Sequence, residues 1–148
     1  MFIIGIDPGA DGAATLSRPD RSIDVFRFKN KTKMDILECF EEWQTEWTDN
    51  RMCLCYLEKV HSMPGQGVSS TFKFGKGWGV LIGLLTALRI PYELVTPNKW
   101  QKYLGCQSKG DKNATKNKAQ QLFPNIKIVH GNADSILIAE YGKRLLND

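Results

Sequence analysis

The chain has 148 residues, of which 42% are hydrophobic and 24% are charged, and its formal net charge is +4. These values are typical of one soluble globular domain, expected over residues 1–148, and the charge permits an anionic partner without requiring one. The longest apolar stretch, GWGVLIGLLTAL, is too short and too often broken by glycine to span a bilayer, so we expect no membrane contact.

The cysteines indicate a reducing compartment. Cys53 and Cys55 flank one residue of a strand-like run, so they share a face but are poorly placed for a disulfide with each other. The chain has no CxxC pair and no signal peptide. We therefore expect reduced thiols and a cytoplasmic location.

The first predicted elements lie in FIIGIDPGADGAATL, residues 2–16. An isoleucine-rich run ends at Asp7, and Pro8 and Gly9 follow, which is typical of a buried strand that leads into a turn. A carboxylate at the end of a buried strand is costly unless it is paired or coordinated. Asp7 is therefore a candidate metal ligand, with a turn-capping role as the alternative. Asp11 is interpreted as a residue of the hairpin turn.

Residues 22–28 alternate and complete an antiparallel three-stranded meander. A capping box at Thr32 and Asp35 then predicts a helix that extends to about Thr48. The apolar positions of this helix recur at helical spacing, which places its two tryptophans in the core.

The next predicted strand, Met52–Val60, also meets a carboxylate near its end, Glu58. A loop rich in Gly, Pro and Ser leads to a helix from about Gly75 to Leu88, which we expect to be packed on several sides because it is rich in glycine and apolar residues. The remaining elements are a strand ending at Thr96-Pro97, a short helix, a polar loop, a helix over 114–122, a short segment over 126–129 and a closing helix over Asn132–Leu146.

This order predicts an α/β protein with a mixed five-stranded sheet flanked by helices, which is the arrangement of ribonuclease H-like folds. In the closing helix, Asp134 shares a stripe with Ile138, Tyr141 and Leu145. It would be an uncompensated buried charge unless it is paired or binds a cation. Carboxylate oxygens suit magnesium or manganese, and two such ions about 3.5–4 Å apart can promote phosphodiester cleavage.

Three stretches, IGIDPG, YLEKV and HGNADSILIAEYG, resemble the acid-bearing motifs of RuvC-type Holliday junction resolvases. The intervening sequence is similar to the versions found in phages and bacterial genomes, and the resemblance covers nearly the whole chain. It implies a homodimeric endonuclease in a bacterial cell, which uses two Mg²⁺ ions, or Mn²⁺, at each site. Such an enzyme cuts two strands of a four-way DNA junction symmetrically. The resemblance places the catalytic metal ligands at Asp7, Glu58 and Asp134.

The chain departs from this family at two places. The family usually has a second acidic residue about one helical turn before the final aspartate, and His130 holds that position here. An imidazole can ligate a metal or act as a general base, so His130 joins the predicted catalytic and metal-binding set, with an exposed histidine as the alternative. The family often has an aromatic wedge shortly after the second acid, where this chain has His61 and Met63.

Two basic regions are predicted to bind DNA. The loop after Glu58 offers hydroxyls, amides and lysines to phosphate oxygens, and a lysine-rich region downstream would follow a second DNA arm. Phe72, Phe74 and Trp78 are candidates for stacking on an unpaired base, with core packing as the alternative for at least two of them. The predicted DNA-binding residues are Ser69, Ser70, Lys73, Lys76, Lys99, Lys112 and Lys116.

Other functions stay open from the sequence alone. The same acids would serve another ribonuclease H-like nuclease that cuts RNA–DNA hybrids or flaps. A non-catalytic junction-binding protein would follow if His130 replaces a lost ligand. An actin-like nucleotide-binding domain also begins with a GIDPG-like strand, but it needs a second phosphate-binding hairpin and a longer chain. Dimerisation, for which Gly75–Leu88 is a candidate interface, would favour the resolvase because symmetric cuts need two sites.

Overall fold

A computed structural model describes residues 1–59 and 65–148 of the chain. The strands are β1 (Phe2–Asp7), β2 (Ala13–Ser17), β3 (Ile23–Arg27), β4 (Cys53–Glu58) and β5 (Tyr92–Val95). The helices are α1 (Lys33–Gln44), α2 (Val68–Ala87), α3 (Pro97–Leu104), α4 (Ala114–Leu122) and α5 (His130–Asn147), and a 3-10 turn spans Asn50–Met52. None of the described helices combines the length and hydropathy needed to traverse a bilayer.

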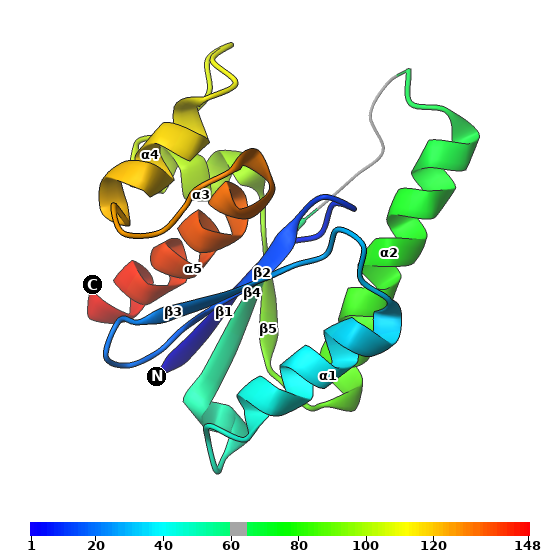
Figure 1. The fold of residues 1–148 in the computed structure, drawn as a ribbon, viewed down its shortest axis with the longest axis vertical. Helices are drawn as coiled ribbons and strands as arrows, with labels where there is room; N and C mark the ends of the chain where they lie inside the picture. The colour runs from blue at the N-terminus through cyan, green and yellow to red at the C-terminus, as the bar shows by residue number, and fades with distance from the viewer. Residues whose placement is uncertain (60–64) are drawn as a thin grey trace.

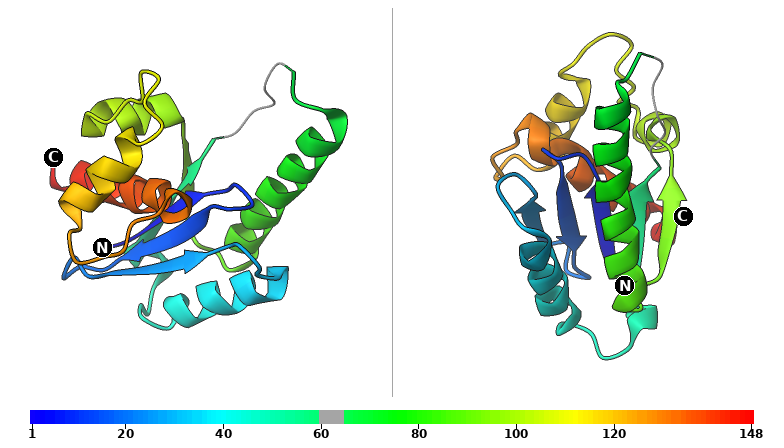
Figure 2. Two further views of the ribbon diagram at one scale, coloured as in Figure 1. Left: turned by 45° about the horizontal axis from the view of Figure 1, so that its top comes forward. Right: turned by 90° about the vertical axis from the view of Figure 1, so that its right-hand side faces the viewer.

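The five strands form one mixed sheet in the order β3-β2-β1-β4-β5 (Figure 1). β1 pairs with β2 in antiparallel and with β4 in parallel orientation, and β4 pairs with β5 in parallel orientation. Helices α1 and α2 lie on one face of the sheet, and α3, α4 and α5 lie on the other (Figure 2). The predicted α/β architecture with a five-stranded mixed sheet is therefore confirmed.

Each face of the sheet has its own apolar core because strand side chains alternate between faces. Ile4 and Ile6 of β1 pack toward α1 and α2, whereas Ile3 packs toward α5. Helix α1 begins at the predicted capping box but ends at Gln44, earlier than predicted. Trp47 is buried all the same, because its ring packs against that of Phe2 in β1, with the ring centroids 5.1 Å apart.

Helix α5 lies unusually close to β1. A Cβ at Gly5 would fall 2.3 Å from the backbone nitrogen of Ala139 and 2.5 Å from the carbonyl oxygen of Ser135. Only a glycine at this position allows the approach, so Gly5 determines how near α5 comes to the middle of the sheet. A buried hydrogen bond of 2.9 Å between the hydroxyls of Thr15 and Ser135 also joins the helix to β2.

The prediction for α2 was wrong in two respects. The helix begins at Val68, so part of the predicted Gly-rich loop is helical. It is also not packed on several sides, since only Leu81 and Leu85 are buried and its N-terminal half extends beyond the sheet (Figure 1). The glycine content of a sequence does not distinguish a helix packed against neighbours from one that leaves its glycines open.

Candidate active site

Asp7 lies at the carboxyl end of the central strand β1, where the chain turns toward β2. One carboxylate oxygen accepts a hydrogen bond of 3.3 Å from the amide of Gly9. A Cβ at Gly12 would fall 2.2 Å from the carbonyl oxygen of Asp7, so the turn requires a glycine there. Burial, and then the charge of Asp134, raise the pKa of Asp7 to about 6, although the Gly9 amide acts in the opposite direction.

Glu58 ends β4, the parallel neighbour of β1. Ile6 pairs with Leu57 in the register, so Asp7 and Glu58 leave the sheet side by side at the same edge. Burial raises the pKa of Glu58 to about 8, and the charges of Asp7 and Asp134 also raise it. Two of the three predicted acids are thus placed together by the strand register alone.

Trp100 of α3 holds the side chain of Glu58. Its indole N–H donates a hydrogen bond of 2.8 Å to Oε2 of Glu58, which lowers the pKa of that carboxyl against the effect of burial. Trp100 is fully buried. The sequence analysis did not identify Trp100. The available signal was a tryptophan in the short helix that starts after Thr96-Pro97, since a buried indole N–H usually needs a hydrogen-bond partner.

Asp134 approaches the same edge from α5. It lies in the second turn of the helix, and burial raises its pKa, whereas the side chains of Thr115 and His130 lower it. The predicted stripe is confirmed, since Ile138 and Tyr141 on the same face are buried. The close approach of α5 at Gly5 explains why this carboxylate influences the two strand-end acids.

The three carboxylates therefore share one electrostatic environment. Asp134 raises the pKa of Asp7, and both raise that of Glu58, so ionisation of each disfavours ionisation of its neighbours. Within residues 1–59 and 65–148, however, no three His, Cys, Asp or Glu side chains are grouped as a site that could hold a metal ion. The fit to a cation rests on the donor chemistry, which is three half-buried carboxylates that repel one another.

His130 is the first residue of α5, which begins two residues earlier than predicted. Its side chain is exposed, and its charge lowers the pKa of Asp134. The histidine is therefore near Asp134 and open to solvent, which fits both the ligand or base role and the exposed alternative. His61 and Met63, at the expected wedge position, lie outside the described residues.

The first group of predicted DNA-binding residues lies on α2 and not on a loop. Ser69, Ser70, Lys73 and Lys76 fall in its first turns, and all four are exposed. Ser70 and Lys73 line a hollow of about 300 Å³ with Pro8 and Ala10 of the turn that follows Asp7. This part of α2 therefore borders the acidic strand ends.

The second group lies on the opposite side of the strand ends. Lys99 is in the first turn of α3, Lys112 is in the loop before α4, and Lys116 is on α4. Lys99 and Lys112 are exposed and Lys116 is half-buried. The neighbouring Thr115 interacts with Asp134, so the start of α4 lies near the acids. The start of α2 and the α3–α4 loop both project at the same end of the molecule (Figures 1 and 2).

The aromatic residues of α2 differ in exposure. Phe72 is 74% exposed, whereas Phe74 and Trp78 are half-buried. The indole N–H of Trp78 donates a hydrogen bond of 3.2 Å to the carbonyl oxygen of Glu58. Phe72 therefore remains the accessible stacking candidate.

The arrangement was compared with known proteins. No protein-family model matches the chain, and no curated protein matches its sequence. Two solved structures of Thermus thermophilus RuvC, one in complex with a Holliday junction substrate, align over 98% of this chain and 96% of theirs, with TM-scores of 0.64 and 0.65. The chain has the RuvC fold. The sequence identity to both RuvC structures is 14%.

The yeast mitochondrial Holliday junction resolvase covers 96% of this chain and 77% of its own, with a TM-score of 0.49 and 14% identity. The likeness to the RuvC structures confirms, for the fold, the resemblance seen in IGIDPG, YLEKV and HGNADSILIAEYG.

Proposed function

We propose that this protein is a metal-dependent endonuclease that resolves four-way DNA junctions. The observation that carries the proposal is the set of Asp7, Glu58 and Asp134, which come from three elements to one sheet edge, where Asp134 raises the pKa of Asp7 and both raise that of Glu58. Half-buried carboxylates that repel each other favour a divalent cation as a shared partner. The RuvC fold, and the junction substrate bound to one RuvC structure of that fold, support four-way DNA as the substrate.

Mg²⁺, or Mn²⁺, would be held by Asp7, Glu58 and Asp134, with His130 beside them, and two ions at each site are proposed. The metal would supply activation of water and neutralisation of charge on the leaving oxygen. The protein's own groups position these ligands. Trp100 fixes one oxygen of Glu58, and the Gly9 amide holds one oxygen of Asp7.

The DNA would lie across this end of the molecule. Lysines on α2 and around α3 and α4 lie on two sides of the acids, where they would neutralise phosphates of separate arms. Ser70 and Lys73 line a hollow with Pro8 and Ala10 of the turn after Asp7, so we propose them as contacts to the strand that is cut. Lys112 and Lys116 would then contact a second arm.

A homodimer is also proposed, with α2 as its interface. Gly75, Gly79 and Gly83 recur at helical spacing on an exposed face of this helix, and a Cβ added at any of them would meet no atom within 4 Å beyond the helix's own backbone. An open stripe of small residues lets a second helix approach closely. Two copies related by a two-fold axis would present two sites to one junction.

The experiment for the nuclease is incubation of the protein with a labelled four-way junction, a matched duplex, a flap and an RNA–DNA hybrid. Each substrate is tested with Mg²⁺, with Mn²⁺ and with a chelator. We expect paired symmetric cuts in the junction that require metal. Cutting of the hybrid or flap alone would support the catalytic role of the acids but contradict the four-way junction as the substrate. Tight junction binding without cutting would indicate a non-catalytic binding protein.

The dimer is tested with Gly79→Glu. The monomer has open space at this position, and glycine is a poor helix former, so the substitution should preserve folding. Sedimentation velocity should show a dimer for the wild type and a monomer for the variant, which should cut junctions without pairing its cuts. A variant that remains dimeric would exclude this face of α2 as the interface.

A further inference from the structure

The outer edge of the sheet at β3 has unpaired backbone groups. The backbone amide of Arg18 donates a hydrogen bond of 2.9 Å to the carbonyl oxygen of Ser22, and the backbone amide of Phe28 donates one of 3.0 Å to the carbonyl oxygen of Gly12. Since hydrogen-bonded pairs alternate along an antiparallel ladder, Asp24 and Phe26 must bond to β2. The amides and carbonyls of the intervening residues, Ile23, Val25 and Arg27, therefore point to the open side.

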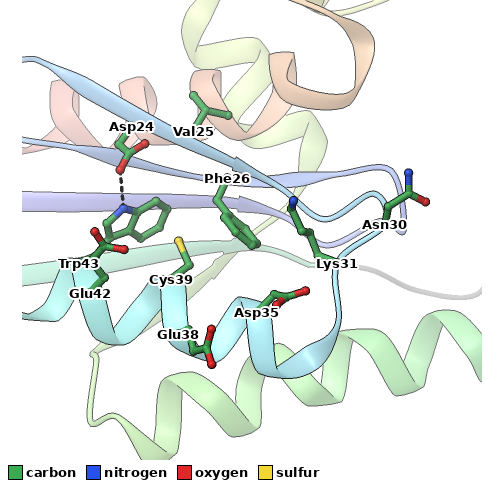
Figure 3. Close-up of a pocket in the computed structure, with 10 residues that line it drawn as sticks. All are labelled: Asp24, Val25, Phe26, Asn30, Lys31, Asp35, Glu38, Cys39, Glu42 and Trp43. Carbon is green, nitrogen blue, oxygen red and sulfur yellow. Dashed lines mark hydrogen bonds between the residues drawn. The ribbon is translucent and has the colours of Figure 1, made fainter.

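This open edge lies beside α1, and the two elements enclose a groove of about 450 Å³ (Figure 3). Phe26 and Trp43 form part of its apolar surface, and the Trp43 indole donates a hydrogen bond of 2.8 Å to Asp24. An open strand edge next to a groove is the geometry that binds an extended peptide, because the backbone supplies hydrogen bonds and the groove takes alternate side chains.

The groove is acidic. Four carboxylates line it, and the only cation among its described lining residues, Lys31, lies 6.0 Å from the ring of Phe26. Asp24 accepts a hydrogen bond from Trp43 and forms an ion pair with Arg18. Asp35 accepts a hydrogen bond from the backbone amide of Thr32 in the capping box. Across residues 1–59 and 65–148, Glu38 and Glu42 have no ion pair or hydrogen bond through their carboxylates. These two lie one turn apart on α1, where like charges are mildly destabilising.

We propose that the edge of β3 and the groove beside α1 dock an extended, lysine- or arginine-rich segment of a partner protein. The segment adds as a further strand to β3, and its basic side chains, at every second position, face Glu38 and Glu42. The acidic lining repels a nucleic acid. A second copy of this chain is disfavoured for the same reason, because a two-fold contact would place Glu38 and Glu42 against identical acids.

The test uses a fluorescein-labelled peptide of alternating lysine and valine, Lys-Val-Lys-Val-Lys-Val, and fluorescence anisotropy with the full chain. A peptide of the same composition in the order Lys-Lys-Lys-Val-Val-Val is the control for charge alone. We expect the alternating peptide to bind at least about tenfold more tightly. Two N-methylated versions of the alternating peptide each block the amides on one side of the strand. Their affinities should differ, because only one side of an added strand pairs with β3.

The protein variant is Glu38→Gln with Glu42→Gln, and the matched control is Glu41→Gln, which is exposed on α1 outside the groove. We expect about tenfold weaker peptide binding for the double variant and no change for the control. Equal binding of both peptides, equal effects of the two methylation patterns, or an unchanged double variant would each overturn the proposal.

Discussion

Two groups of carboxylates in this protein differ in how they are buried. Asp7 and Glu58 at the strand ends and Asp134 on α5 are half-buried, and this burial raises the pKa of each, so they form the more buried group. Glu38 and Glu42 lie on the surface of α1, where water solvates their charges. A tryptophan N–H donates a hydrogen bond of 2.8 Å at each place, from Trp100 to Glu58 within the first group and from Trp43 to Asp24 beside the second.

The number of acids therefore does not by itself indicate a metal site. The buried group is costly when ionised, so a divalent cation would stabilise it strongly, whereas a solvated group gains little from one. The exposed group is instead suited to a long-range or exchangeable partner such as a basic peptide. This division can be tested by substitution, beginning with the largest expected effect.

Asp7→Asn removes one charge from the buried group while keeping the size of the side chain. Because charge stabilisation by a metal is worth several kcal/mol, we expect junction cleavage to fall by about 10³-fold or more, with junction binding retained. Single-turnover cleavage and a mobility-shift assay measure the two quantities. The Glu38→Gln, Glu42→Gln variant is the control, and cleavage by Asp7→Asn near the wild-type rate would remove Asp7 from the site.

His130→Ala tests whether the exposed neighbour of Asp134 belongs to the reaction. A lost ligand or general base should slow cleavage by about 10²-fold. The rate should be measured in both Mg²⁺ and Mn²⁺, with circular dichroism as the control for folding. An unchanged rate would assign His130 to the exposed surface.

Trp100→Phe and Trp43→Phe compare the effects on cleavage of the two tryptophan hydrogen bonds to acids. Loss of the indole N–H removes a hydrogen bond to a charged group, so we expect cleavage to fall about tenfold and its pH dependence to move upward as the pKa of Glu58 rises further. Trp43→Phe removes the equivalent bond to Asp24 and should leave cleavage unchanged. Equal losses in the two variants would mean that general destabilisation, and not the position of Glu58, sets the rate.

The pH dependence of stability should come from the buried group. The folded-state pKa values of Asp7 and Glu58 lie above their ordinary values of 3.8 and 4.5, so the folded protein binds these protons more tightly than the unfolded chain. Their stabilising contribution is complete below these ordinary values and is lost as the pH rises through about 6 for Asp7 and about 8 for Glu58.

In chelator, we therefore expect the free energy of unfolding to fall between about pH 5 and pH 8, and Glu58→Gln to remove roughly 3 kcal/mol of that fall. Urea denaturation at several pH values measures it. A pH dependence that Glu58→Gln leaves intact would show that this carboxyl is not buried as an acid.

The sequence was sufficient for the features that local patterns determine. An apolar run that stops at a carboxylate predicted Asp7 and Glu58 at strand ends, and helical spacing predicted that Asp134 faces the core. The capping box at Thr32 predicted the start of α1 to the residue. Each of these signals depends on neighbours within a few positions along the chain.

Features that depend on packing between distant segments were missed. The hydrogen bond of Trp100 to Glu58 joins residues 42 positions apart. The start of α2 was placed too late because glycine and serine disfavour helix locally, and its exposed face was mistaken for a packed one. The groove at β3 was also missed, since no local pattern reveals that a strand lies at the outer edge of a sheet.

The most direct test of the central claim is titration calorimetry of Mn²⁺ and Mg²⁺ into the protein without DNA. We predict metal uptake by the wild type and by the Glu38→Gln, Glu42→Gln variant, and its loss in Asp7→Asn and Asp134→Asn. Uptake that survives neutralisation of Asp7 and Asp134, or disappears with Glu38 and Glu42, would contradict the assignment of the buried carboxylates as the metal site.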